Sequence, residues 1–136
     1  MRELKFRAWH ETDKCWYNPR FIEMNLLGQA IMHHGLEQFE IIPASAIEQY
    51  TGLKDKNGKK IYEGDIVKFA DLELAMKPTG VVCFADGRFF VKDWEFNDGS
   101  YHIVDFYDYN IPHKDFEVIG NIHEKSELLE DENGKN

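Results

Sequence analysis

Long apolar runs, cysteine, reactive serine and glycine-rich loops are all scarce or missing in this chain of 136 residues. No apolar run approaches the ~20 residues that a membrane-spanning helix needs, and the N-terminus alternates charged and apolar residues instead of forming a secretory signal. We therefore expect a soluble cytoplasmic protein. In that compartment the two cysteines, Cys15 and Cys83, should stay reduced and serve as small apolar packing residues.

The motifs that usually build a catalytic, metal or cofactor site are also missing. The six histidines show no HxxxH or HxH spacing, and the adjacent His33 and His34 would point to opposite faces of a strand. No serine lies in a nucleophile elbow, and no loop resembles a phosphate-binding loop. A metal-dependent hydrolase would need folding to bring Asp65 together with His102 and Asp105. We therefore predict a protein that is not an enzyme and holds no metal or cofactor.

What the chain does have is enough apolar material for a core. Hydrophobic residues make up 43% of it and aromatic residues 14%, which excludes a disordered chain. Its length suits one ordinary domain that needs neither a metal nor a disulfide for stability. We predict a single domain over residues 1–130, followed by a disordered acidic tail at 131–136.

Charge is distributed unevenly along the chain. Residues 1–92 carry equal numbers of acidic and basic side chains, so the last third, residues 93–136, holds the whole formal net charge of −9. Nucleic-acid affinity depends on phosphate neutralisation by Lys and Arg, so we expect this third to repel DNA and RNA. A solvated acidic surface is the simpler interpretation, and a recognition surface is the alternative.

The clearest structural signal is a hairpin turn at Asn57-Gly58, a dipeptide that readily accepts the positive φ of a tight turn. Two registers fit the residues around it. A two-residue Asn57-Gly58 loop would place Leu53 opposite Tyr62. A type I turn that begins at Asp55, with Gly58 as the bulge glycine, would shift the partner of Leu53 by one residue. The sequence leaves both registers open.

A second turn follows the hairpin. Gly64 and Asp65 have the turn chemistry to reverse or kink the chain before a new strand begins at Ile66. Together with Asp55, Asn57 and Gly58, they are the residues to which we assign a structural turn role.

The N-terminal part predicts short strands. Residues 4–9 alternate apolar and charged side chains, as a half-buried strand does, and the turn at 13–14 would return the chain to a short run at 16–17. Residues 21–42 fit either short strands around glycine turns or a broken helix, and Gly28 and Gly35 favour strands. Residues 44–50 fit either a short helical turn or a strand.

The second half continues the β pattern. Residues 80–84 and 88–92 read as two strands joined by an Asp-Gly turn, and a further strand is expected at 101–107. We therefore predict a mainly β fold, either a curled antiparallel sheet or a small, partly open barrel of SH3-like type. Ser126 is placed to cap a short C-terminal helix over 127–130.

Three segments resemble the YopX family of small phage and prophage proteins. They are residues 1–9, residues 49–67 around the hairpin, and residues 116–124 followed by Glu127-Leu128-Leu129. The resemblance implies a β-rich fold, a phage or prophage setting in a bacterial host cell, and self-association. It implies no activity and no catalytic residues. Residues 17–43 show no comparable motif, so a function located there would be particular to this protein.

The candidate interface joins a basic and an aromatic set. The basic set surrounds the hairpin tip and comprises Lys54, Lys56, Lys59 and Lys60, beside Tyr62. The aromatic set lies in the acidic part of the chain and comprises Trp94, Phe96, Tyr107 and Tyr109. We hypothesise that the hairpin of one copy docks on the acidic, aromatic surface of the next, which would give a closed ring such as a trimer.

Two partner classes follow from this hypothesis. The first is a protein of the phage or of its host. The second is the alternative function, weak nucleic-acid binding by the hairpin at 54–62, although the acidic third makes nucleic acid an unlikely partner.

Overall fold

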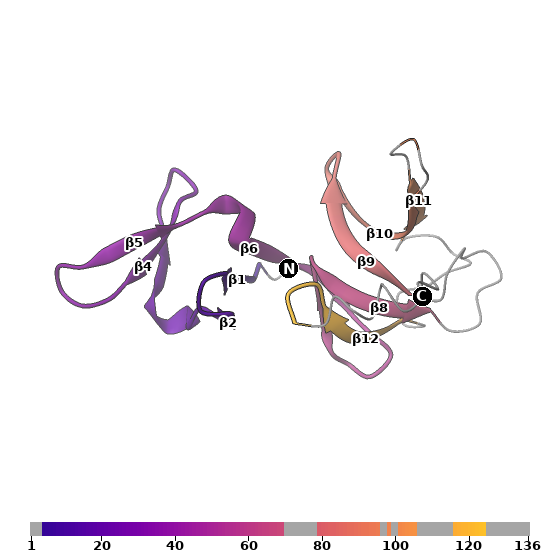
Figure 1. The fold of residues 1–136 in the computed structure, drawn as a ribbon, viewed down its shortest axis with the longest axis horizontal. Coiled ribbons are helices and arrows are strands. Elements are labelled where there is room, and N and C mark those ends of the chain that lie inside the picture. The colour runs from indigo at the N-terminus through magenta and orange to yellow at the C-terminus, as the bar shows by residue number, and fades with distance from the viewer. Residues whose placement is uncertain (1–3, 70–78, 96–97, 99–100, 106–115, 125–136) are drawn as a thin grey trace. The chain divides into compact units, whose positions relative to one another are not determined.

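The computed structural model describes residues 4–69, 79–95, 98, 101–105 and 116–124 (Figure 1). Contacts divide the chain into an N-terminal unit, residues 4–49, and a C-terminal unit, whose described residues begin at Tyr50. Each unit is a β structure of its own. The single domain over residues 1–130 stays a prediction. The predicted helix at 127–130 and the acidic tail lie outside the described residues.

Short antiparallel strands build the N-terminal unit. Strand β1 (Phe6–His10) pairs with β2 (Cys15–Trp16), and on its other side with the first residues of β6 (Ile47–Lys54). A three-stranded meander lies between them in sequence and consists of β3 (Ile22–Met24), β4 (Ala30–His33) and β5 (Phe39–Ile42). The short strands predicted for residues 21–42 are thus confirmed.

Two 3-10 turns join these strands. The first, η1 (Pro19–Phe21), begins with a proline at its first position and is capped by the Asn18 side chain, which accepts a hydrogen bond from the Arg20 amide. The second, η2 (Ala44–Ala46), leads directly into β6. Both alternatives for residues 44–50 therefore occur, one after the other. No α-helix occurs within the described ranges.

The meander has an inner and an outer face because side chains alternate along each strand. Ala30 pairs with both Met24 and Ile42, which places the three on one face. Ala30 and Ile42 are buried with Ala8 of β1 in a small apolar cluster, so this is the inner face. Ile41 and Phe39 lie on the outer face.

The C-terminal unit is a five-stranded antiparallel sheet in the order β11-β10-β9-β8-β12. Its strands are β8 (Asp65–Phe69), β9 (Thr79–Ala85), β10 (Arg88–Glu95), β11 (Tyr101–Asp105) and β12 (Phe116–Asn121). The last part of β6 and β7 (Lys60–Tyr62) form a hairpin in the same unit. The sheet curls into a half-barrel, which confirms the predicted mainly β, curled antiparallel fold (Figure 1).

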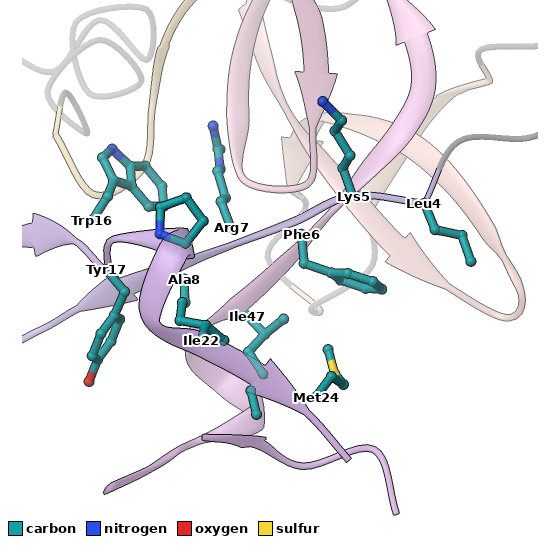
Figure 2. A pocket seen from close by; sticks show the side chains of 12 residues that line it. Leu4, Lys5, Phe6, Arg7, Ala8, Trp16, Tyr17, Ile22, Met24 and Ile47 are labelled. Atoms are coloured by element: carbon teal, nitrogen blue, oxygen red, sulfur yellow. The ribbon is translucent and has the colours of Figure 1, made fainter. Parts of the chain in front are cut away.

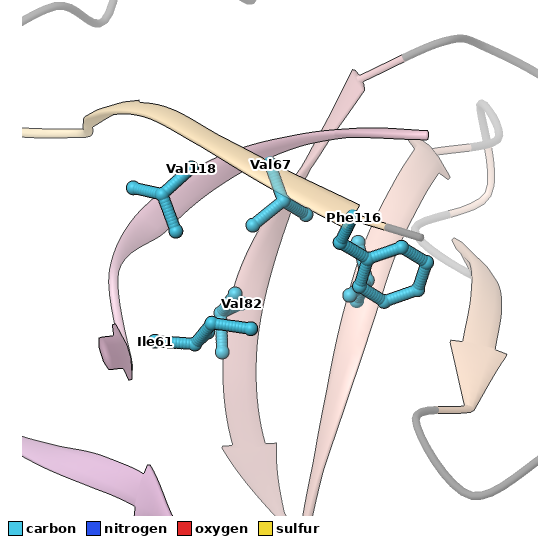
Figure 3. Packing of buried hydrophobic residues seen from close by; sticks show 6 residues of the cluster. Ile61, Val67, Val82, Phe116 and Val118 are labelled. Carbon is cyan, nitrogen blue, oxygen red and sulfur yellow. The ribbon is translucent and has the colours of Figure 1, made fainter. Parts of the chain in front are cut away.

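The core of the C-terminal unit lies inside this curl. Figure 3 shows Val67 of β8 and Val118 of β12 facing Val82 of β9 and Ile61 of the β6–β7 hairpin. Val91 and Phe116 complete the buried cluster, and Leu53 and Phe89 pack against it. Burial of an aliphatic or aromatic side chain contributes about 1.5–3 kcal/mol, so this cluster is the main apolar contribution to the stability of the unit.

The β9–β10 hairpin forms at the predicted Asp-Gly turn. Arg88 pairs with Ala85, which leaves a loop of two residues, Asp86 and Gly87. Both have positive φ, 53° and 78°, as a type I′ turn requires. The turn matches the twist of the two strands, and Val82 and Val91 consequently face each other across the hairpin.

The structure selects the second of the two registers considered for the β6–β7 hairpin. The amide of Gly58 donates to the carbonyl of Asp55 at 3.0 Å, the amide of Asp55 donates to the carbonyl of Lys59 at 2.8 Å, and Gly58 has φ +82°. This is a type I turn followed by a glycine bulge. Lys54 accordingly pairs with Lys60, which sets Leu53 toward Ile61.

The Asp55 side chain holds this turn and fastens it to β12. One carboxylate oxygen accepts the amides of Asn57 and Lys59 at 2.8 and 2.9 Å, and the other accepts the amide of Val118 at 2.9 Å. Asp55 is only 5% exposed. Burial by itself would raise the pKa of the carboxyl, but the three amides and the charge of Lys59 outweigh it and lower the pKa.

The second predicted turn is built in a similar way. The carboxylate of Asp65 is buried and accepts the amide of Tyr62 at 2.8 Å. Gly64 joins neighbouring segments through its backbone, since its amide donates to Val82 and its carbonyl accepts from Ile122. Both residues therefore have the structural turn role that the sequence indicates.

Removal of the Asp55 carboxylate should destabilise the protein. We expect Asp55→Ala to lower the free energy of unfolding by about 3 kcal/mol, because three buried amides lose a charged acceptor. The pKa of Asp55 is lower in the folded state, so its contribution should be complete above pH 3.8 and disappear as the pH falls through the folded-state pKa. Urea denaturation of both proteins at pH 7 and pH 3 measures this.

The exposed acid Glu37 provides the control. Glu37→Ala should leave stability within about 0.5 kcal/mol of the unsubstituted protein, as is usual for a surface substitution. An equally small effect of Asp55→Ala at pH 7 would contradict the role assigned to this carboxylate.

Candidate interaction site

The structure places the predicted basic set around the β6–β7 hairpin. Lys54, Lys56 and Lys59 are exposed, and Lys60 is half-buried. Lys56 forms an ion pair with Glu117 of β12 at 3.5 Å, within the same unit. Part of the positive charge at the hairpin is therefore already balanced by the chain itself.

The predicted aromatic member of the hairpin, Tyr62, packs inside the unit. Its ring lies 5.5 Å from the ring of Tyr50, and the ammonium group of Lys60 lies 5.6 Å from the Tyr50 ring on the other strand. Tyr62 is half-buried and thus has a packing role beside any role in an interface.

Of the predicted aromatic set, only Trp94 falls within the described residues, on β10. Phe96, Tyr107 and Tyr109 lie outside the described residues. The proposed docking of the hairpin on this set therefore stays a prediction.

Exposed apolar side chains gather on the N-terminal unit instead. On the outer face of the meander, Phe39 is 62% exposed and Ile41 56%. The β3–β4 and β4–β5 turns carry Leu26 and Leu36, which are fully exposed at 106% and 105%. Leu27 and Phe21 are also exposed. We call Phe39, Ile41, Leu26, Leu27 and Leu36 the outer apolar surface.

A groove of about 420 Å³ lies on the opposite, inner side of the meander (Figure 2). Its apolar wall comes from Ile22 and Met24 of β3, Ala30 of β4, and Ile47 of β6. Phe6 projects from β1 toward the same wall. The groove can therefore hold apolar side chains.

The other side of the groove is polar and aromatic. Lys5 and Arg7 extend from β1 away from the apolar wall (Figure 2). The guanidinium group of Arg7 lies 4.4 Å from the centre of the Trp16 ring, and its Nε donates to Glu48 at 3.0 Å. These two contacts hold the Arg7 side chain at the rim of the groove.

Beside the groove, Tyr17 takes part in a short hydrogen-bonded array. Its hydroxyl donates to Glu40 of β5 at 2.6 Å, and the other oxygen of Glu40 lies 3.3 Å from His34. Burial, followed by the bond to Glu40, raises the pKa of Tyr17 to about 12. The bond from Tyr17 lowers the pKa of Glu40 despite the opposing effect of burial. The array joins β5 to the chain segment after β2.

The remaining candidate groups stay apart. His33 pairs with Glu23 at 3.0 Å, whereas His34 pairs with Glu40, as expected for adjacent residues that point to opposite sides. Within the described ranges, no three His, Cys, Asp or Glu side chains are grouped in a way that could hold a metal ion. No helix in the described part of the chain is long and apolar enough to cross a membrane.

The two cysteines differ in their surroundings. Cys83 of β9 is half-buried, and this burial raises the pKa of its thiol. Cys15 is exposed, so the prediction that it serves as a packing residue is wrong. It lies at the start of the short strand β2, opposite His10.

Comparisons with known proteins identify the family. The family model described as YopX protein matches residues 5–130. The chain belongs to the YopX family. Among solved structures it is similar to protein EF1440 from Enterococcus faecalis, with 30% sequence identity and a TM-score of 0.56. That match covers 95% of this chain and 99% of the other. No match was found among curated proteins.

For this YopX protein, the residues that carry the family resemblance near the hairpin form turns and hydrogen bonds. Asp55 and Gly58 build the turn, and Gly64 and Asp65 build the next one. Thr51 also belongs to this framework, since its hydroxyl donates to the carbonyl of Ile61 at 2.8 Å. These residues of the family motif therefore have a structural role.

Sequence reasoning missed both the outer apolar surface and the groove. Leu26, Leu27 and Leu36 stand next to Gly28 and Gly35, around which the sequence predicts turns. Turns usually carry polar residues, and this was the available signal for the surface. The groove had no comparable signal, because its residues come from five separate segments between Leu4 and Ile47.

The Tyr17 array can be tested by titration. In protein with 13C-labelled tyrosine Cζ, we expect the Tyr17 resonance to report a protonated phenol at pH 11, one unit below its pKa of about 12. The raised pKa means that this hydroxyl stabilises the fold up to about pH 10, and that the contribution is lost as the pH rises from 10 to 12.

Tyr17→Phe identifies the resonance and serves as the reference. The difference in stability between the two proteins should be constant from pH 7 to 9 and shrink above pH 10. Ionisation of Tyr17 near pH 10 in the folded protein would show that the bond to Glu40 does not form.

Proposed function

We propose that this YopX protein is a non-enzymatic accessory protein of a phage or prophage, and that it self-associates and binds a protein of the phage or its host. The phage setting comes from the family resemblance. The single observation that carries the binding role is the outer apolar surface of the N-terminal unit.

The solvation cost of the exposed side chains and their residue types both support an interface at this surface. Exposed leucines at the tips of two hairpins cost solvation free energy and add nothing to the core of their own unit. Phe39 and Ile41 are neighbours on one face of β5. Adjacent exposed apolar side chains usually mark a protein contact, and Phe39 is of the residue type that is enriched in such contacts. The hydrogen-bonded side chains of His33 and Glu23 lie on the same face, with His33 opposite Phe39, and add polar groups beside the apolar ones.

A second copy of the chain is the occupant that we propose for this surface. The meander exposes Phe39 and Ile41 on one flat face, and two such faces could pair about a two-fold axis. The partner from phage or host would then bind elsewhere on the assembly.

The introduction of positive charge on the outer face should dissociate the assembly. We expect Phe39→Lys combined with Ile41→Lys to reduce the assembled mass to that of a monomer, because two buried ammonium groups would face each other across the interface. Analytical ultracentrifugation at several concentrations measures the mass. Unchanged circular dichroism would show that the fold is retained.

Glu11→Lys with Asp13→Lys, two exposed acids in the turn between β1 and β2, provides a control with the same number of substitutions and a greater charge change in the same unit. It should leave the mass nearly unchanged. If the apolar-face variant sedimented like the unsubstituted protein, the outer apolar surface would not be the self-association site.

The basic hairpin is the second surface that we propose for self-association, and a different variant tests it. If it docks on the acidic part of a neighbouring copy, Lys59→Glu with Lys60→Glu should lower the assembled mass at low salt, and added salt should have the same effect on the unsubstituted protein. An unchanged mass at low salt would exclude the hairpin from the interface. Salt-sensitive retention of nucleic acid by the unsubstituted protein alone would favour the nucleic-acid alternative.

A further inference from the structure

Within the part of the chain that the structure describes, strand β1 has an open edge at Phe6. In an antiparallel ladder, the N–H and C=O of a residue point to the same side, and successive residues alternate. The carbonyl of Ala8 accepts the amide of Tyr17 at 2.9 Å, so the peptide groups of Ala8 point toward β2. Those of Phe6, two residues earlier, point to the same side.

β2 ends too early to cover this edge. It pairs only with Trp9 and His10, and after Tyr17 the chain turns away at Pro19 into η1. Among the described strands, none pairs with β1 at Phe6 on that side. The other side is taken, because Phe6 and Arg7 lie opposite Gln49 and Glu48 of β6.

The groove surrounds this open edge. Five consecutive residues, Leu4 to Ala8, line it, and they include side chains from both faces of β1. A pocket on one face of a strand would touch only alternate residues. All five line the groove, with Phe6 toward the apolar wall and Lys5 and Arg7 away from it (Figure 2), which places the groove along the edge where an added strand would lie.

The two faces of β1 define what an added strand should carry. On the Phe6 side, its side chains would meet the apolar wall of Ile22, Met24 and Ile47. On the other side, they would meet the basic side chains of Lys5 and Arg7, and the charge of Arg7 is offset in part by its bond to Glu48. An extended segment with apolar and acidic side chains at alternate positions satisfies both.

We propose that the groove binds an acidic, apolar-alternating segment of a partner protein by strand addition to the edge of β1. Strand addition gives affinity through main-chain hydrogen bonds and specificity through pockets for alternate side chains. This inference deepens the proposed function, because it names the chemistry of the partner and a site separate from the outer apolar surface.

A synthetic heptapeptide tests the proposal. The probe is Asp-Val-Glu-Ile-Asp-Val-Glu, blocked at both ends and titrated to about 1 mM into 15N-labelled full-length protein, a range that covers typical weak peptide affinities. We expect saturable shifts at Leu4, Phe6 and Met24, with Kd below about 1 mM, and slower hydrogen exchange of the Phe6 amide, which gains a bond. No saturable shift at these residues would overturn the proposal.

Three altered peptides separate the contributions. The first carries Lys in place of every acidic residue. The other two have N-methyl groups on the odd or on the even residues, so each lacks the main-chain donors of one edge but keeps its side chains. The Lys peptide and one of the two N-methyl peptides should bind at least about tenfold more weakly than the probe. Equal binding of the Lys peptide would overturn the charge assignment, and equal binding of both N-methyl peptides would overturn strand addition.

Met24→Glu and Ile41→Glu form a matched pair of variants on the two faces of the meander. Met24→Glu should weaken binding of the probe at least about tenfold, whereas Ile41→Glu should leave binding unchanged and affect only the assembled mass. Loss of peptide binding to Ile41→Glu alone would overturn the groove as the site. Peptide binding with no self-association would leave the groove intact and refute the proposed self-association.

Other occupants would give distinct results. If a second copy fills the groove, protection of the Phe6 amide should rise with protein concentration without any peptide. If the acidic segment at 127–132 of the chain fills it, the amide should be protected at every concentration, and Leu128→Ser with Leu129→Ser should remove that protection. Either result would overturn the assignment to a separate partner protein.

Discussion

The buried carboxylate of Asp55 is the constraint on which the C-terminal unit depends. A charged group in the interior is costly unless its oxygens are satisfied, and here three backbone amides from two distant segments satisfy them. Two of these bonds form the hairpin turn, and the third reaches Val118, 63 residues further along the chain. The β6–β7 hairpin is thereby fixed over the end of β12, which allows Ile61 to enter the same core as Val118.

Local turn chemistry explains which parts of this fold the sequence predicts. Asn57-Gly58 and Asp86-Gly87 each admit few backbone conformations, so hairpins were predictable at both. The register at Asn57-Gly58 was not, because Asn-Gly suits a two-residue loop whereas Asp55 at the start of the turn suits a type I turn with a glycine bulge, so local patterns support both registers. The short strands around Gly28 and Gly35 were predictable for the same local reason.

The candidate site was less predictable than the fold. The lysines between 54 and 60 form a clear charge cluster in the sequence. In the structure, however, Lys56 forms an ion pair with Glu117, and Lys60 lies beside the ring of Tyr50. The groove, by contrast, is formed by tertiary packing: Phe6, Ile22 and Ile47 are ordinary apolar residues until β1 and the meander come together. What makes the edge of β1 available is that β2 is only two residues long, and strand length is among the features that sequence patterns determine least well.

The turn at Asn57 also bears on how the protein ages. Asparagine followed by glycine is the sequence in which the side-chain carbonyl is most readily attacked by the next peptide nitrogen, which closes a succinimide ring and then yields aspartate or isoaspartate. In the folded chain the backbone N–H of Gly58 donates to the carbonyl of Asp55, and the backbone N–H of Asn57 donates to the Asp55 carboxylate. Folding therefore protects the Asn57-Gly58 bond against succinimide formation. Isoaspartate formed while the chain is unfolded would lengthen the backbone by one atom within the turn, and such molecules could no longer close it around Asp55.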